Sequence, residues 1–492
     1  MSLPGNPVPP DARPLSVVVV GGSGDLARRK VFPALFALYC QGFLPQQFSI
    51  FGFARSEFAD DRFRELIGAN LMCRYTPDHS CADRMHGFLA RCFYVSGDYS
   101  SVDSFLDLYH VMRREDGAAG DHLFYLAIPP SLYMDVARSL GNCGLVRCGG
   151  SGPWTRAVVE KPFGRDRESS DALAGELARV FTEEQIYRID HYLGKEAIQN
   201  LLVLRFANAI FEPLWNRRHI AAVRITWKED MPVGDRGGYF DGFGIIRDVM
   251  QNHLLQMMAL TAMEQPRGLD AAAVRNEKVR LLRAVPPIRL NDMVIGQYGA
   301  SARGDMKFRS YTEEQGVPPD SITPTFAAAV LRVENERWAG VPFLLSAGKG
   351  LDGRMTEIRV LFRPLPANLF RGASDCPEPN EFVIRVQPDE SIVLRIVNKV
   401  PGSGMKLAER SLDLRYSEAF SETIPDAYEN LLLQVLRGDR SLFIRGDELA
   451  AAWDIFTPVL GEMERHHVRP ETYEFGSAGP AGAGFLAGRL GL

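Results

Sequence analysis

The sequence contains no long apolar segment and few cysteines or histidines. No apolar run reaches the roughly 18 residues that a membrane-spanning helix needs, so we expect no membrane association. The seven cysteines are scattered and include no CxxC pair, which argues against a disulfide scaffold or a structural zinc site and favours a reducing compartment. The nine histidines include no HExxH pattern, so we expect no metal site. The cysteines are Cys40, Cys73, Cys81, Cys92, Cys143, Cys148 and Cys376.

The chain also lacks an excess of positive charge. It has 56 Lys and Arg against 61 Asp and Glu, a formal net charge of −5, which argues against a nucleic-acid partner. Its 492 residues, 46% of them hydrophobic, suffice for about two to four globular domains.

The two ends of the chain differ in composition from the rest. Residues 1–14 hold five prolines and no apolar core of a signal peptide, so we expect a flexible arm and a cytoplasmic protein. Residues 477–492 are rich in Gly and Ala, and we expect a mobile tail.

Residues 15–190 alternate between short apolar runs and helix-like stretches. This alternation predicts an α/β domain of the Rossmann type, with a parallel sheet between helices. The expected strands are 15–20, 48–53, 93–95, 123–126 and 157–159.

The pattern changes in residues 191–476. A strand over 221–228 and a long amphipathic helix over 245–264 precede several strands without helices between them. Consecutive strands predict a larger β+α domain with an extended, mostly antiparallel sheet. The later strands are expected at 327–333, 357–362, 382–386 and 392–397, and two further helices at 426–436 and 447–466.

A glycine-rich segment joins the first strand to the first helix. Its Gly22-x-Gly24-x-x-Ala27 pattern fits the dinucleotide fingerprint, in which glycines let the backbone approach a pyrophosphate at a helix N-terminus. A turn without a ligand is the alternative, but the preceding valines and the following helix favour the nucleotide. The expected coenzyme contacts are Gly21, Gly22, Ser23, Gly24, Asp25 and Leu26.

The end of the second strand favours NADP over NAD. An acidic residue there binds the ribose 2′-hydroxyl of NAD, whereas an arginine accommodates the 2′-phosphate of NADP. This strand ends in Arg55-Ser56, and Lys30 is a second candidate cation.

Three further segments carry candidate substrate groups. Lys161, in Glu-Lys-Pro-Phe-Gly, follows a strand and is placed to reach both coenzyme and substrate; the following Pro162 is a candidate cis proline. His191, Tyr192 and Lys195, in Arg-Ile-Asp-His-Tyr-Leu-Gly-Lys-Glu, offer the donors and positive charge that a phosphate needs. A helix start capped by Asp190 is an equally good interpretation of that segment.

The third segment contains Asp248 and His253. A histidine and a carboxylate can form a general base and the group that orients it. Their spacing of five residues is poor for one face of an α-helix, and a capping Asp248 with a core histidine is the alternative.

Together these motifs resemble the glucose-6-phosphate dehydrogenase family over residues 16–476. The resemblance implies oxidation of glucose 6-phosphate at C1 to the 6-phosphogluconolactone with hydride transfer to NADP⁺, the first step of the oxidative pentose phosphate pathway. It also implies a homodimer or homotetramer assembled through the sheet domain.

The resemblance further implies roles for individual residues. His253 is the general base and Asp248 its partner, and Lys161 touches both substrate and coenzyme. The remaining substrate contacts that it implies are His191, Tyr192, Lys195, Glu229, Lys349, Arg354 and Gln387.

Two other functions fit parts of the sequence. A dehydrogenase of a non-phosphorylated sugar, of the glucose-fructose oxidoreductase type, also combines a Rossmann domain, an open sheet and an EKP segment. An NADP-sensing binding module has no need of a second anion site, so the His/Tyr/Lys segment argues against it.

Overall fold

The computed structural model describes residues 13–75, 78–116, 120–146, 152–303, 306–365, 369–370 and 379–490. Nearly all of the expected N-terminal arm, together with Cys148 and Cys376, lies outside these ranges. Within them, no helix combines the length and apolar character needed to cross a bilayer.

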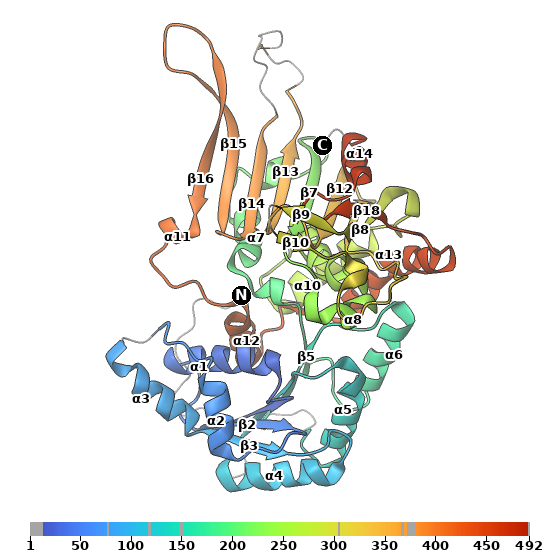
Figure 1. The fold of residues 1–492 in the computed structure, drawn as a ribbon. Helices are drawn as coiled ribbons and strands as arrows, with labels where there is room; N and C mark the ends of the chain where they lie inside the picture. The colour runs from blue at the N-terminus through green and yellow to red at the C-terminus, as the bar shows by residue number, and fades with distance from the viewer. Residues whose placement is uncertain are drawn as a thin grey trace.

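A seven-stranded sheet forms the first half of the molecule (Figure 1). From one edge to the other it contains β17 (Phe443–Ile444), β6 (Ile186–Ile189), β5 (Thr155–Glu160), β4 (Asp121–Leu126), β1 (Leu15–Val20), β2 (Phe48–Ala54) and β3 (Cys92–Ser96). All neighbours are parallel except β17 and β6. Every residue of β1 is buried, as a strand of nearly pure valine covered on both faces requires. The predicted Rossmann-type sheet is confirmed.

Helices accompany this sheet. They are α1 (Phe32–Cys40), α2 (Asp60–Gly68), α3 (Asp78–Leu89), α4 (Val102–Asp116), α5 (Tyr133–Asn142) and α6 (Arg167–Leu177). Strand β1 pairs with β2 on one side and β4 on the other, so the strands that follow β1 are added first on one side of it and then on the other. A ligand crevice is expected at that point, beyond the carboxyl ends of the strands.

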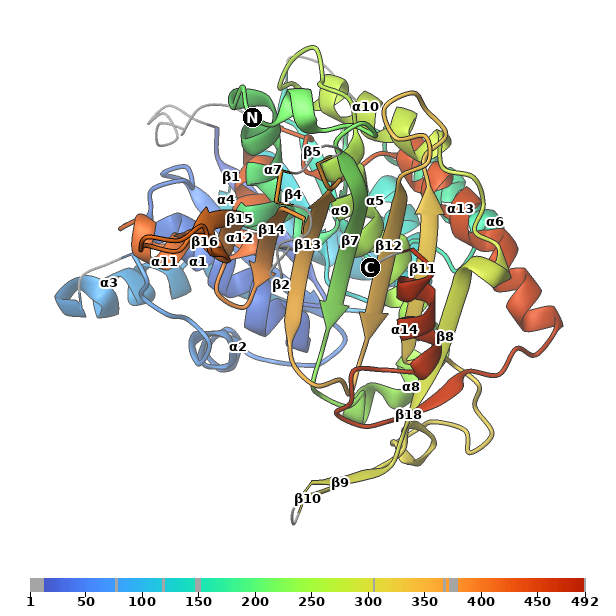
Figure 2. The ribbon, with the colours of Figure 1, turned by 90° about the horizontal axis from the view of Figure 1, so that it is seen from above.

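A nine-stranded sheet forms the second half and is seen face-on in Figure 2. Its order is β16 (Leu407–Arg415), β15 (Ser391–Lys399), β14 (Glu381–Gln387), β13 (Met355–Phe362), β7 (Ile220–Lys228), β12 (Pro342–Gly348), β11 (Phe326–Arg332), β8 (Met293–Gly299) and β18 (Glu471–Glu474). Its pairs are antiparallel except β7–β12 and β8–β18, which confirms the mostly antiparallel sheet. A small hairpin of β9 (Ser301–Arg303) and β10 (Met306–Phe308) projects beside it.

The helices of this half are α7 (Glu196–Ala207), α8 (Gly237–Asp241), α9 (Leu255–Ala262), α10 (Ala271–Arg283), α11 (Tyr416–Ala419), α12 (Ala427–Arg437), α13 (Gly446–Arg465) and α14 (Ala481–Gly488). A π-helical segment, η6 (Ile246–Leu254), runs directly into α9 and packs against β7 and β12. Helix α12 lies between the two sheets, against α1 (Figure 1). Strand β17 joins the first sheet by pairing with β6. Residues far along the chain therefore complete the first half of the molecule.

Two features of the structure were not expected from the sequence. Residues 481–488 of the expected mobile tail form helix α14, in which Leu486 is buried. Cys73, in the connection from α2 to α3, forms a disulfide with Cys81 of α3, with their Cα atoms 5.8 Å apart. The absence of a CxxC motif excluded a known pattern but not a bond across a loop of ordinary length.

Candidate functional site

The glycine loop turns from β1 into a helix. Gly21 has φ +84°, and a Cβ there would lie 2.4 Å from the Ala127 carbonyl oxygen, so only glycine fits. The amide of Arg28 donates to the carbonyl of Gly24, so the helical turns begin at this loop. The first turn of a helix has amides without partners inside the helix, which can bind a pyrophosphate, so the loop fits the dinucleotide that the sequence predicts.

The two candidate cations for the 2′-phosphate lie in different surroundings. Arg55 directly follows β2, its guanidinium 5.6 Å from the centre of the Tyr99 ring, and it forms no ion pair with any residue in the described ranges. Lys30 instead lies 3.1 Å from Asp426 at the start of α12. Arg55 therefore fits the predicted 2′-phosphate contact, whereas Lys30 is engaged with α12.

Lys161 follows β5 and its peptide bond to Pro162 is cis. Its Nζ donates to the Asp248 carboxylate at 2.9 Å and to the Asp248 backbone carbonyl at 2.6 Å. Burial by itself raises the pKa of Asp248, but Lys161 and Lys349 lower it well below its usual value, so this carboxyl is ionised. The partner of Asp248 is thus the lysine of the coenzyme half.

The predicted pairing of His253 with Asp248 is wrong. His253 Nδ1 lies 2.5 Å from Oδ1 of Asp190, and both side chains are buried. Asp190 directly follows β6, a strand that the sequence analysis missed, and it also accepts the Tyr192 amide at 3.0 Å as a helix cap. The π-helical turn brings Asp248 and His253, five residues apart, close enough that each shifts the pKa of the other, although they pair with different partners.

The charge states follow from burial and this pairing. Burial by itself raises the pKa of Asp190, but His253 lowers it to about 2. Burial lowers the pKa of His253 although Asp190 opposes this, so the imidazole is neutral near pH 7. A carboxylate only accepts hydrogen bonds, so the ring proton lies on Nδ1 and Nε2 keeps a free lone pair.

Asp190, His191 and His253 also place three possible ligand atoms within 4.8 Å of one another. The hydrogen bond between Asp190 and His253 explains why two of these atoms are adjacent without invoking a metal ion.

Of the phosphate candidates, His191 and Tyr192 lie on a short 3₁₀ turn, η3 (His191–Gly194), beside this pair, and Lys195 directly follows it. The His191 ring lies edge-on to His253, with 4.7 Å between centroids. Burial lowers the pKa of His191 well below its usual value, and burial also lowers the pKa of Lys195. An incoming phosphate would raise both pKa values and so favour the charged form of each group.

Tyr192 connects this turn to the antiparallel sheet. Its hydroxyl accepts from Trp227 Nε1 at 2.6 Å and from Gln387 Nε2 at 3.1 Å, and lies 3.4 Å from Thr356. Burial raises the pKa of Tyr192 to about 12, so the hydroxyl keeps its proton. The structure therefore brings Gln387, from the end of β14, to the phosphate segment, as the resemblance implies.

Two sugar-side candidates are paired with each other. Lys349 Nζ lies 2.6 Å from Glu229, directly after the end of β7, and 5.1 Å from the Trp227 ring centroid. Arg354 is exposed. Burial is the largest cause of the lowered pKa of Lys195, and the positive charge of Arg354 also lowers it, whereas two nearby acids raise it. Arg354 therefore lies near the phosphate segment.

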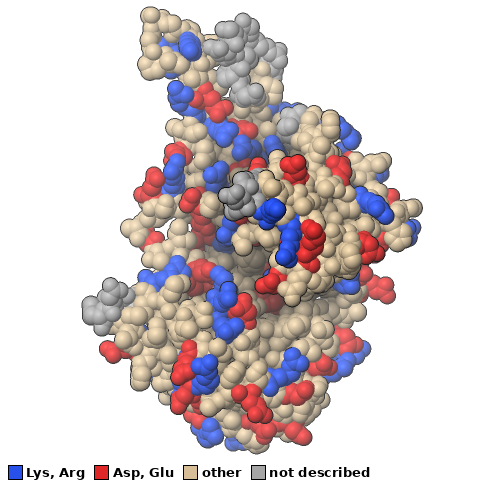
Figure 3. Space-filling model, in the orientation of Figure 1, with Lys and Arg blue, Asp and Glu red and all other residues tan. Residues whose placement is uncertain are grey.

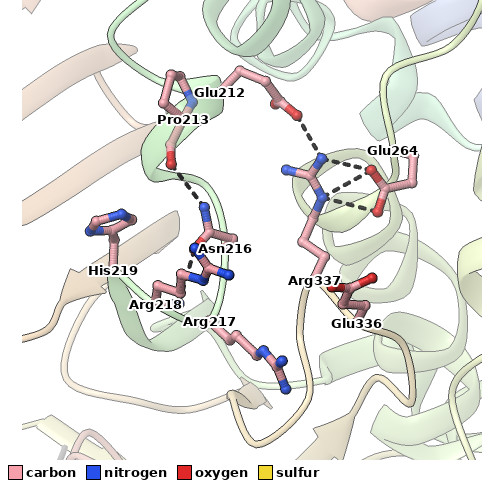
Figure 4. A pocket seen from close by; sticks show the side chains of 9 residues that line it. All are labelled: Glu212, Pro213, Asn216, Arg217, Arg218, His219, Glu264, Glu336 and Arg337. Carbon is pink, nitrogen blue, oxygen red and sulfur yellow. Dashed lines mark hydrogen bonds and ion pairs between the residues drawn. The ribbon is translucent and has the colours of Figure 1, made fainter.

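A separate cavity of about 400 Å³ lies at the opposite end of β7, before Ile220 (Figure 4). Arg337 reaches across it to Glu212 at 2.7 Å and Glu264 at 2.6 Å. None of the residues predicted for the site lines this cavity.

Comparison with known proteins agrees with this arrangement. A family profile described as "Glucose-6-phosphate dehydrogenase, NAD binding domain" matches residues 18–200, and one described as "Glucose-6-phosphate dehydrogenase, C-terminal domain" matches residues 202–491. The chloroplastic glucose-6-phosphate 1-dehydrogenase of Nicotiana tabacum is 52% identical over 96% of this chain and 80% of that protein. The glucose-6-phosphate 1-dehydrogenase of Dictyostelium discoideum is 45% identical over 98% of this chain and 96% of that protein.

Solved structures give the same result. A glucose-6-phosphate dehydrogenase in complex with its substrate glucose-6-phosphate superposes with a TM-score of 0.90 at 40% identity, covering 98% of both chains. The glucose-6-phosphate 1-dehydrogenase of Mycobacterium avium superposes with a TM-score of 0.82 at 36% identity, covering 97% of both. The chain belongs to the glucose-6-phosphate dehydrogenase family.

Proposed function

We propose that this enzyme oxidises glucose 6-phosphate at C1 to the 6-phosphogluconolactone with NADP⁺ as coenzyme, and that His253 is its general base. The observation that carries this proposal is the buried His253–Asp190 pair beside a cationic phosphate segment. The dehydrogenase of a non-phosphorylated sugar is not favoured, because such an enzyme needs neither His191 nor Lys195.

Proton transfer and phosphate binding are assigned to different residues. Nε2 of His253 takes the proton of the C1 hydroxyl while Asp190 holds the ring and stabilises the imidazolium that forms. His191, Tyr192, Lys195 and Arg354 hold the phosphate. This anchoring can supply roughly 7–11 kcal/mol of the barrier reduction through positioning.

The sugar and the coenzyme have their own contacts. Lys161, Asp248, Glu229 and Lys349 hold the sugar hydroxyls, Lys161 also lies toward the coenzyme, and Gln387 contacts the substrate beside Tyr192. The glycine loop and Arg55 hold the pyrophosphate and the 2′-phosphate. When bound, NADP⁺ supplies the hydride acceptor.

The oligomer is also a proposal. Edge strand β16 exposes Leu412 and Leu414, which supports a homodimer or homotetramer formed through the nine-stranded sheet. On the face shown in Figure 3, charges of both signs are interspersed, and we propose no nucleic-acid partner. A cytoplasmic location stays a prediction, since relatives of both chloroplastic and cytoplasmic description match.

A spectrophotometric assay tests the function. We expect NADPH formation with glucose 6-phosphate and little with glucose at equal concentration. Equal rates with both sugars would favour the non-phosphorylated alternative, and no NADPH with any sugar phosphate would contradict a catalytic role.

A further inference from the structure

Glu160 is a buried carboxyl group that the proposed mechanism leaves without a role. It is the last residue of β5, directly before Lys161, and only 9% of it is exposed. Its backbone is fixed by Tyr133, whose hydroxyl donates to the Glu160 carbonyl at 2.8 Å and accepts from the Glu160 amide at 3.1 Å.

Two tyrosine hydroxyls converge on the Glu160 carboxylate. Tyr125, on the neighbouring strand β4, donates to Oε1 at 2.5 Å. The hydroxyl of Tyr428, in the first turn of α12, interacts with the same carboxylate closely enough that each group shifts the pKa of the other. Glu160 thereby ties α12, from the far end of the chain, to the coenzyme sheet.

The ring of Tyr428 lies against the proposed phosphate ligand His191. The two rings are nearly parallel, at 10°, with 6.2 Å between centroids. The His191 imidazole makes no hydrogen bond with any residue in the described part of the chain, so its orientation depends on contacts with Tyr192, His253 and Tyr428. Of these three rings, that of Tyr428 is the one whose hydroxyl interacts with Glu160, and its helix α12 is docked on the phosphate segment by Asn430, which donates to the Gly194 carbonyl at 2.9 Å.

We propose that Glu160 is a positioning residue for the substrate phosphate, because its carboxylate holds the Tyr428 ring against His191. Glu160 does not touch substrate or coenzyme in this account. The inference rests on the proposed role of His191, but it concerns only how that side chain is held.

The protonation state of Glu160 provides a specific readout. Burial raises its pKa to about 7, with Tyr125, Lys161 and Tyr428 acting in the opposite direction and Asp190 adding to the rise. These groups surround the Glu160 carboxyl from several elements: Tyr125 on β4, Lys161 directly after β5, Asp190 directly after β6 and Tyr428 on α12. Tyr133, on α5, contacts its backbone. The ionised carboxylate accepts from both tyrosines, whereas the acid must use one oxygen as a donor, so one tyrosine loses its acceptor.

The experiment compares Glu160→Gln, Tyr428→Phe and the double variant. We expect each single change to raise KM for glucose 6-phosphate on the order of three- to tenfold, as loss of one hydrogen bond does, with kcat and KM for NADP⁺ within about twofold. The double variant should be no worse than either single one, because both remove the same interaction. The KM ratio of Glu160→Gln to the unmodified enzyme should shrink toward one as the pH falls below 7.

Tyr75→Phe is the matched control. Tyr75 donates at 2.6 Å to Glu429, the residue after Tyr428 on the same helix, and its loss should leave KM for glucose 6-phosphate unchanged. Additive effects in the double variant, an equal rise in Tyr75→Phe, or a KM ratio independent of pH would overturn the proposal. Those results would leave the assay of the activity itself unaffected, so the two failures can be told apart.

Discussion

His253 and Asp190 meet at 2.5 Å although 63 residues separate them in the chain. One comes from a π-helical turn of the antiparallel half and the other from the end of a strand in the coenzyme sheet. The base and its orienting carboxylate therefore exist only when the two halves of the molecule are docked.

Replacement of Asp190 tests this pairing. Asp190→Asn keeps a hydrogen-bond acceptor for Nδ1 but removes the negative charge that stabilises the imidazolium. We expect kcat to fall by about 10²- to 10⁴-fold with KM for glucose 6-phosphate little changed. Asp248→Asn is the comparison and should mainly raise KM, because Asp248 holds Lys161. The reverse pattern would restore the pairing that the sequence suggested.

The pH profile tests the charge state of the base. His253 must be neutral to accept a proton, and burial lowers its pKa below 6.5. The acid limb of kcat/KM should therefore lie below pH 6.5, with the rate lost as pH falls through that limb. An acid limb above pH 7 would show that the base is not a buried histidine of this kind.

Substitutions in the phosphate segment should weaken substrate binding rather than chemistry. For His191→Asn and Lys195→Ala we expect KM for glucose 6-phosphate to rise about ten- to a hundredfold, the range of a lost charged hydrogen bond. His219→Asn, an exposed histidine at the separate cavity, is the control and should have no effect. Unchanged KM with lost turnover would exchange the roles of His191 and His253.

Arg55 should determine the preference for NADP⁺. Arg55→Ala removes the proposed 2′-phosphate contact, so KM for NADP⁺ should rise about tenfold or more while KM for NAD⁺ changes little. Arg62→Ala, an exposed arginine paired with Glu65 on α2, is the matched control. An equal loss with both coenzymes would remove Arg55 from recognition of the 2′-phosphate.

Periodicity predicted most strands of the two sheets but not the β6–β17 edge of the first sheet. The valine-rich β1 and five strands of the second half, β7, β11, β13, β14 and β15, were identified because each carries a strong local pattern, whereas β8, β12, β16 and β18 were not predicted. Strand β6 was missed because its Ile-Tyr-Arg-Ile segment is short and contains a charge, and β17 because it has only two residues.

The motif residues of the site could be predicted from local sequence, but their interaction partners could not. The residues of each motif are local, so Lys161, His191 and His253 could be chosen from the sequence. Their partners could not, because Asp190 pairs with His253 only through the docking of two halves, and Tyr428 reaches His191 from α12. Recognising residues 186–189 as a strand would have placed Asp190 beside Glu160, at the ends of neighbouring parallel strands.

The kinetics of His253→Asn test the central claim most directly. The substitution removes the base and leaves the phosphate segment intact. The account predicts a fall in kcat of about 10²- to 10⁴-fold with KM for glucose 6-phosphate within about threefold of the unmodified enzyme. Turnover close to that of the unmodified enzyme would contradict it.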